Sequence, residues 1–166
     1  MNRRQFLETG AWATTGTVLG AKSQAHAKTT FSSSTGAQRK MFIYGGNYHE
    51  TFNRYVGQLT GKDVPKVCFL GTASGDSDRY INGWLATTEK TSVKPFVQRS
   101  FINSLRQDRD FDEVFLEMDA IVVGGGNTLN LLAVWAAQGI DKALKKAYEN
   151  GVILAGGSAG SMCWFE

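Results

Sequence analysis

Three short, uninterrupted apolar runs constrain the fold of this chain more than any other feature. The runs are VCFL, AIVV and VILA, and turn-forming residues bound each of them. Strands that are continuously apolar, without polar alternation, are typical of parallel sheets covered on both faces. Segments with helical character separate the runs. The sequence therefore predicts an α/β fold, a doubly wound and mostly parallel sheet with helices on both faces.

The expected strands and helices alternate along the chain. Strands are predicted at Lys40–Tyr44, Lys66–Gly71, Val93–Phe101, Ala120–Val123 and Val152–Ala155. Helices are predicted at Tyr48–Leu59, Asp78–Lys90, Phe111–Glu117, Thr128–Ala137 and Asp141–Glu149. In the first two helices, apolar residues recur at three- and four-residue spacing. A length of 166 residues with 42% hydrophobic and 20% charged residues fits one globular domain.

The first 27 residues resemble a twin-arginine export signal. Arg3 and Arg4 precede a mildly apolar stretch over residues 10–21, and Ala25-His26-Ala27 provides the small-x-small pattern that a signal peptidase accepts. The stretch is too short and too polar to anchor the chain in a bilayer. We therefore expect the twin-arginine export machinery to recognise residues 1–27. The mature protein is expected in the periplasm or outside the cell, without stable membrane insertion.

A linker is expected to follow the signal. Residues 28–38 are rich in serine, threonine and glycine and have no periodicity, which is typical of a connecting segment. The folded domain is therefore expected to cover residues 39–166.

Charge and cysteine content disfavour two function classes. Residues 1–27 contain three of the 18 basic and one of the 15 acidic residues, so the remainder is nearly neutral and no nucleic-acid surface is predicted. The chain has no CxxC motif or His/Cys cluster, so we predict no metal site. Cys68 and Cys163 lie in apolar surroundings and are expected to be buried.

Glycines lie at the carboxyl ends of four of the five predicted strands, at Gly45-Gly46, Gly71, Gly124–Gly126 and Gly156-Gly157. The carboxyl ends of parallel strands meet at one edge of the sheet, where such folds bind ligands. Three consecutive glycines are more than a turn requires, and backbone N–H groups near a helix start can hold a phosphate or an oxyanion. A nucleotide cradle is the weaker alternative, because Leu129 stands where the third glycine of GxGxxG would be and no GxxxxGK[ST] motif occurs.

The segment Gly156-Gly157-Ser158-Ala159-Gly160 matches the G-x-S-x-G elbow, after a predicted strand and before a predicted helix. Small flanking residues allow the sharp turn that exposes Ser158 Oγ over the sheet edge. The amide of Ala159 can then donate to a developing oxyanion. A structural alternative is that Ser158 only caps a helix. Cys163 is a poorer candidate nucleophile, because it lies inside the helix.

Two segments together carry a resemblance to a known family. VVGGGNTLNLL, residues 122–132, and GVILAGGSAGSMCWFE, residues 151–166, resemble the peptidase E branch of serine peptidases, related to cyanophycinase. The resemblance runs from about Lys40 to Glu166 and implies the fold of class I glutamine amidotransferases, a flavodoxin-like arrangement. It implies that Ser158 is the nucleophile and that Gly126 and Ala159 supply oxyanion-hole amides. It also implies a small peptide substrate, cleaved next to an N-terminal aspartate in the best-known members, and no cofactor.

A serine nucleophile needs a base, and the base needs an orienting acid. The resemblance places both after the elbow, but only eight residues follow Ser158 and none is histidine. His49 follows the first strand and could approach the same edge, although a surface or helix-capping role is the simpler interpretation. Glu166 follows Ser158 too closely to be assigned as the acid. We therefore expect the chain to be the N-terminal part of a longer protein, truncated at its C-terminus, which cannot complete a turnover alone.

Two other functions stay open at this point. The glycine-lined edge could belong to a non-catalytic module that binds a small molecule or an anion. An amidotransferase is disfavoured because the elbow carries a serine where that class has a cysteine. Substrate contacts are also unassigned, since the sequence does not place Arg79, Arg99 or Arg106.

Overall fold

A five-stranded sheet in the order β1-β5-β4-β2-β3 forms the centre of the fold, and every strand pair is parallel. The structure is a computed structural model that describes residues 38–101 and 109–165. The expected signal peptide over 1–27 and all but the last residue of the expected linker lie outside the described residues. The strands are β1 Met41–Tyr44, β2 Lys66–Leu70, β3 Lys94–Gln98, β4 Ala120–Val123 and β5 Ile153–Gly157.

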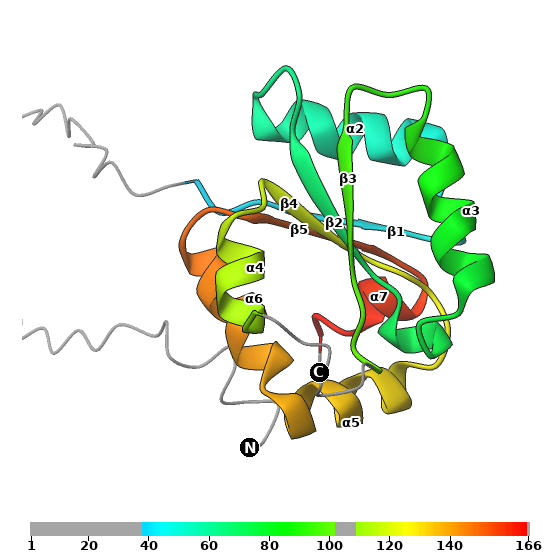
Figure 1. Ribbon diagram of the computed structural model, residues 1–166, viewed down its shortest axis with the longest axis vertical. Coiled ribbons are helices and arrows are strands. Elements are labelled where there is room, and N and C mark those ends of the chain that lie inside the picture. The colour runs from blue at the N-terminus through cyan, green and yellow to red at the C-terminus, as the bar shows by residue number, and fades with distance from the viewer. Residues whose placement is uncertain (1–37, 102–108, 166) are drawn as a thin grey trace, which may run out of the picture. The chain divides into compact units, whose positions relative to one another are not determined.

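Helices cover both faces of this sheet (Figure 1). The first layer consists of α2 Glu50–Thr60 and α3 Asp78–Thr88. The second consists of α4 Phe111–Leu116, α5 Thr128–Gln138, α6 Ile140–Glu149 and α7 Ala159–Met162. A 3-10 turn, η1 Thr72–Ser74, follows β2. The predicted doubly wound α/β fold is confirmed.

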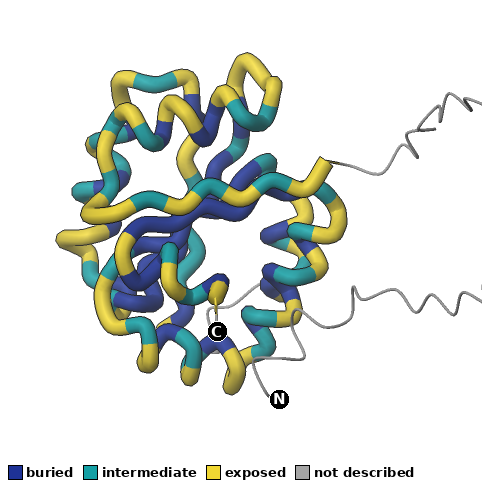
Figure 2. Tube along the Cα trace, turned by 180° about the vertical axis from the view of Figure 1, so that it is seen from behind, coloured by how far each residue is buried: buried dark blue, intermediate teal, exposed yellow. Residues whose placement is uncertain are grey.

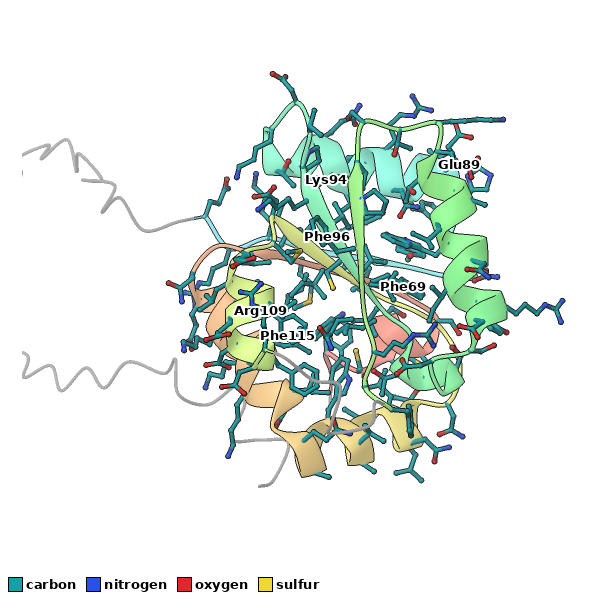
Figure 3. The ribbon with its side chains drawn as sticks, viewed as in Figure 1. Phe69, Glu89, Lys94, Phe96, Arg109 and Phe115 are labelled. Carbon is teal, nitrogen blue, oxygen red and sulfur yellow. The ribbon has the colours of Figure 1, made fainter. Side chains whose placement is uncertain are left out.

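Side chains that alternate along the central strands enter two separate cores. Val67 and Phe69 of β2 pack with α2 and α3, whereas Cys68 and Leu70 pack with α4, α5 and α6. Successive residues of a strand point to opposite faces, so a strand with a helix layer on each side must be apolar throughout. Figure 2 shows the result, with buried residues in the interior and exposed residues around them. Figure 3 labels one residue of each core, Phe69 and Phe115.

Two strand ends differ from the prediction by two residues or more, and both differences have physical reasons. The third strand was predicted to run to Phe101, but β3 ends at Gln98, because the N–H groups of Ser100 and Phe101 donate to the carboxylate of Asp76 instead of to a strand. The fifth strand was predicted to end at Ala155. Strand β5 continues to Gly157, because its pairing with β1 extends to the residue pair Tyr44 and Gly157.

Strand β1 is an edge of the sheet, and its residues alternate between exposed and half-buried. Phe42 packs toward the α2 side, while Met41 and Ile43 are exposed on the other side. Within the described residues, no helix is long and apolar enough to cross a membrane.

Candidate active site

Ser158 occupies the sharp turn between β5 and α7. Its backbone has φ 52° and ψ −120°, a region that non-glycine residues rarely adopt, and its side chain is exposed. Such strain costs on the order of 1–3 kcal/mol and persists only where the surroundings enforce it. The N–H of Ser158 donates to the carbonyl of Tyr44 at 3.3 Å, and Ser161 Oγ donates to the carbonyl of Ser158 at 2.7 Å. Both flanks of the turn are therefore held.

The glycines of the elbow are required by close packing. A Cβ atom on Gly156 would lie 2.0 Å from the carbonyl oxygen of Gly160, and one on Gly160 would lie 2.1 Å from that of Val123. A Cβ atom on Gly157 would lie 2.3 Å from the ring of Tyr44. Because only hydrogen fits at these positions, α7 can pack directly against the ends of β4 and β5.

The triple glycine after β4 makes a second tight turn. A Cβ atom on Gly124 would lie 2.7 Å from Cζ of Phe69, whose ring lies beneath the turn. Gly126 has φ 144°, and a Cβ atom there would lie 2.1 Å from the carbonyl oxygen of Ala73. That same oxygen accepts a hydrogen bond from the N–H of Asn127 at 2.8 Å. The turn is thus fixed against η1 on one side.

Gly125 brings this turn next to the serine. A Cβ atom on Gly125 would lie 3.1 Å from Cβ and 3.6 Å from Oγ of Ser158. The closeness follows from the sheet order, because β4 and β5 are hydrogen-bonded neighbours whose carboxyl ends lie side by side. The structure therefore brings together the two glycine motifs that the sequence places 32 positions apart, from Gly126 to Ser158.

Three backbone N–H groups in the two turns that meet at Ser158 have no hydrogen-bond partner among the described residues. Among residues 38–101 and 109–165, no group accepts a hydrogen bond from the N–H of Gly125, Gly126 or Ala159. Ala159 is the first residue of α7, where N–H groups have no partner within the helix. These amides are available to an anion. The oxyanion roles of Gly126 and Ala159 stay predictions, and Gly125, which sequence reasoning did not single out, is the glycine in contact with Ser158.

His49 caps a helix in this structure. It is the N-cap of α2, and its Nδ1 accepts a hydrogen bond from the N–H of Thr51 at 3.2 Å and lies 3.1 Å from Thr51 Oγ1. No hydrogen bond joins His49 to Ser158, and Ser158 Oγ has no partner within the described part of the chain. The capping interpretation of His49 is confirmed. Glu166 lies outside the described residues.

Burial suppresses ionisation of the other groups that could compete as nucleophiles. Burial raises the pKa of Cys68 and that of Cys163 to about 12, so both thiols are protonated at neutral pH. The predicted burial holds fully for Cys68, whereas Cys163 is half-buried, with Sγ 3.1 Å from the carbonyl of Gly160. Tyr44, beside the elbow, also has its pKa raised to about 12 by burial.

Two of the three unassigned arginines now have a position. Arg99 forms an ion pair with Asp78 and donates to the carbonyl of Asp76 at 2.9 Å, so its guanidinium holds loops together. Arg79 is exposed at the start of α3. Burial and then the charge of Tyr80 raise the pKa of Tyr48, and Arg79 opposes that rise. Arg106 lies outside the described residues.

A cavity of about 360 Å³ lies at the other edge of the sheet, away from Ser158. Lysines occupy its walls: Lys40 Nζ donates to the carbonyl of Leu59 at 2.8 Å, and Lys62 pairs with Asp119 at 2.6 Å. The candidate site is identified by the geometry around Ser158, at the carboxyl ends of the strands, and not by the size of this cavity. In the described ranges, no three His, Cys, Asp or Glu residues gather as a metal site would require.

Comparison with known proteins identifies the family of this chain. The model of peptidase family S51 matches residues 32–166, which includes the whole described fold. The chain belongs to peptidase family S51. Over 117 residues it is 39% identical to the uncharacterized peptidase YgaJ of Bacillus subtilis (strain 168), covering 70% of this chain and 49% of the relative.

Solved structures share the fold. A peptidase from an acI-B1 Actinobacterium superposes with a TM-score of 0.62 at 19% identity, covering 76% of this chain and 57% of the other. A candidate peptidase E protein from Listeria monocytogenes EGD-e superposes with a TM-score of 0.55 at 23% identity, covering 74% and 59%. The chain spans about half the length of the curated relative YgaJ.

Proposed function

We propose that this S51 protein is a serine-type peptidase that cleaves small peptides and that Ser158 is its nucleophile. Membership of a peptidase family supports hydrolysis of a peptide bond. The observation that carries the proposal is the exposed, strained Ser158 beside a turn of unpaired backbone donors. A serine that served only as a helix cap would not require this strain, and its side chain makes no capping bond to α7.

In the proposed reaction, Ser158 Oγ attacks the carbonyl carbon of the scissile peptide bond and its proton passes to a general base. The carbonyl oxygen becomes an oxyanion, which the N–H groups of Gly126 and Ala159 stabilise. Collapse of this intermediate breaks the C–N bond and the amine leaves with the proton. Water then hydrolyses the acyl-enzyme. We assign the base and its orienting acid to residues outside the described part of the chain, because His49 is engaged at α2.

Substrate size and cellular location are part of the proposal. Dipeptides and other short peptides are the proposed substrates, by the resemblance to peptidase E. Export by the twin-arginine pathway to the periplasm or the exterior is proposed from Arg3 and Arg4. Replacing both arginines by lysine should leave the protein in the cytoplasm, as fractionation would measure, and normal export of that variant would contradict the proposed route.

The test is hydrolysis of a dipeptide panel by the full-length protein and by Ser158→Ala. We expect kcat to fall by about 10³-fold or more, since loss of the nucleophile leaves only binding and oxyanion stabilisation. Ser77→Ala is the matched control. Ser77 caps α3 without a side-chain hydrogen bond, so this variant should hydrolyse dipeptides as fast as the wild type. Undiminished hydrolysis by folded Ser158→Ala would contradict the proposal.

A non-catalytic module that binds a small molecule or anion is the second candidate. It is favoured by one observation, that Ser158 Oγ has no hydrogen-bond partner among the described residues. This function predicts that Ser158→Ala leaves ligand affinity almost unchanged and that no covalent adduct forms. Isothermal titration with a phosphate or carboxylate ligand separates the two functions.

A further inference from the structure

Asp76 combines burial with backbone strain at the same edge of the sheet as Ser158. It follows η1, between β2 and α3, with only 4% of its surface exposed. Its φ of 53° makes it, with Ser158, one of two non-glycine residues with positive φ among those described. A buried carboxylate in a strained backbone persists only where other contacts offset its cost.

The side chain of Asp76 holds the end of a neighbouring strand. Its Oδ2 accepts hydrogen bonds from the N–H groups of Ser100 and Phe101, at 2.5 and 2.7 Å, just beyond β3. Its Oδ1 is buried and has no hydrogen-bond partner within residues 38–101 and 109–165. That oxygen lies against Gly71, where a Cβ atom would be 3.3 Å away. The carboxylate therefore joins the exits of β2 and β3.

The backbone of Asp76 closes the loop around η1. Its N–H donates to the carbonyl of Gly71 at 3.0 Å, and its own carbonyl accepts from Arg99 at 2.9 Å. The N–H and the Oγ of Ser74 also donate to Gly71, both at 2.9 Å. The position of η1 is thus fixed at both of its ends by groups that converge on Gly71.

From η1 the contacts lead to the triple glycine. The carbonyl of Ala73, in the middle of η1, accepts from the N–H of Asn127 at 2.8 Å and leaves no room for a side chain on Gly126. Gly125, one residue earlier, contacts Ser158. A displacement of η1 would therefore move the turn that faces the serine.

We propose that Asp76 is a positioning residue, which holds η1 so that the Gly124–Gly126 turn faces Ser158. The inference rests on the proposed function for its catalytic consequence, but the structural link from Asp76 to Asn127 stands independently of it. The chain of contacts runs from the carboxylate through Gly71 and Ala73 to the turn. Asp76 itself does not touch the reacting atoms.

The first experiment measures native-state amide hydrogen exchange in Asp76→Gly and Asp76→Asn. Glycine accepts the positive φ but lacks the carboxylate, so exchange should rise about tenfold or more at Ser100, Phe101 and Asn127. Asparagine tolerates the same φ and keeps one acceptor oxygen, so Asp76→Asn should restore most of the protection. Increased exchange at Ser100 and Phe101 with unchanged exchange at Asn127 would overturn the proposal.

The matched control is Asp119→Gly. Asp119 also accepts a backbone N–H, that of Lys66 at 2.8 Å, but at the opposite edge of the sheet. The Asp119→Gly variant should increase amide hydrogen exchange near Lys66 and leave the amide of Asn127 protected. An equal loss of protection at Asn127 in both glycine variants would show a general loss of stability and would also overturn the proposal.

The second experiment measures dipeptide hydrolysis by the full-length variants. Displacement of the Gly124–Gly126 turn should lower kcat and leave KM little changed, because the turn binds charge that develops only in the transition state. We expect Asp76→Gly to lower kcat by about 10- to 100-fold, with recovery in Asp76→Asn. An unchanged kcat in folded Asp76→Gly would overturn the catalytic consequence. If the wild type shows no Ser158-dependent hydrolysis, the proposed function fails, and the exchange experiment still decides the structural link.

Discussion

At the scale of single residues, the site depends on glycines, which have no Cβ atom. Glycine at positions 126, 156 and 160 lets backbone segments approach more closely than any Cβ atom allows, and glycine at 124 and 157 leaves room for the rings of Phe69 and Tyr44. Ser158 then carries the one reactive group in a turn otherwise made of backbone. The strain at Ser158 and the close packing of its neighbours have the same origin, since the tight elbow requires both.

The substitution Gly126→Ala tests whether glycine is required for close packing at the turn after β4. The φ of 144° and the contact with the Ala73 carbonyl both exclude a side chain, so we expect the free energy of unfolding to fall by at least about 2 kcal/mol. Gly45→Ala is the control, because it has open space and no positive φ, and its effect should stay within about 1 kcal/mol. Urea denaturation measures both values. Similar effects of the two substitutions would contradict the close approach.

The two cysteines give a prediction about pH. Burial raises both thiol pKa values to about 12, so the thiolate fraction at pH 8 is lower than in an unfolded chain, where thiols ionise near 8.5. We expect both thiols to react with a disulfide reagent at least tenfold more slowly in the native protein than in 6 M guanidinium chloride. Rapid native labelling of Cys163 at pH 8 would show that the α7 region is open.

At the residue scale, the sequence predicted the elbow, Ser158 and the second glycine turn. Local spacing carries those signals, because a G-x-S-x-G motif after an apolar run has few structural interpretations. It did not reveal Asp76, since the contacts of that carboxylate are with residues 24 and 25 positions away. It also did not single out Gly125, because the three glycines are equivalent until their neighbours are known.

At the scale of elements, a buried polar contact connects the two helices of one layer. Asn53 of α2 is 1% exposed; its Oδ1 accepts from Nε1 of Trp84 on α3 at 3.0 Å, and its Nδ2 donates to Thr87 at 2.7 Å. The ring of Trp84 stacks on Phe69, with centroids 5.0 Å apart. Phe69 in turn lies under Gly124, so this helix layer supports the floor of the candidate site.

Asn53→Ala should therefore destabilise the protein by about 1–3 kcal/mol, because it leaves the buried Trp84 N–H without an acceptor. Arg54→Ala, on the exposed side of the same helix, removes an ion pair with Glu50 and should change stability by less than about 1 kcal/mol. Thermal unfolding followed by circular dichroism compares the two. Equal losses would show that the Asn53–Trp84 contact does not connect the helices.

The order and type of the elements followed from periodicity, whereas their ends did not. Continuous apolar runs identified the central strands correctly, because both faces of each are buried. The end of β3 was predicted too late, since the Asp76 carboxylate takes the N–H groups beyond Gln98. The end of β5 was predicted too early, since Gly156 and Gly157 pair with β1 like ordinary strand residues.

At the scale of the whole molecule, the order of strands in the sheet brings distant segments of the chain together at the candidate site. All five strands of the parallel sheet end at one edge, although they are distant in sequence. Tyr44 touches Gly157, Ala73 touches Gly126, and Gly125 touches Ser158, so the edge is continuous. Membership of family S51 supports the proposal that this edge carries out hydrolysis of peptide bonds.

The central claim is that Ser158 Oγ faces donors of the Gly124–Gly126 turn and of α7. A crystal structure of the full-length protein after reaction with a fluorophosphonate tests this most directly. We predict an adduct on Ser158 whose phosphonyl oxygen lies about 2.7–3.1 Å from the amide nitrogens of Gly126 and Ala159. An adduct on another residue, or a phosphonyl oxygen directed to solvent away from both amides, would contradict the account.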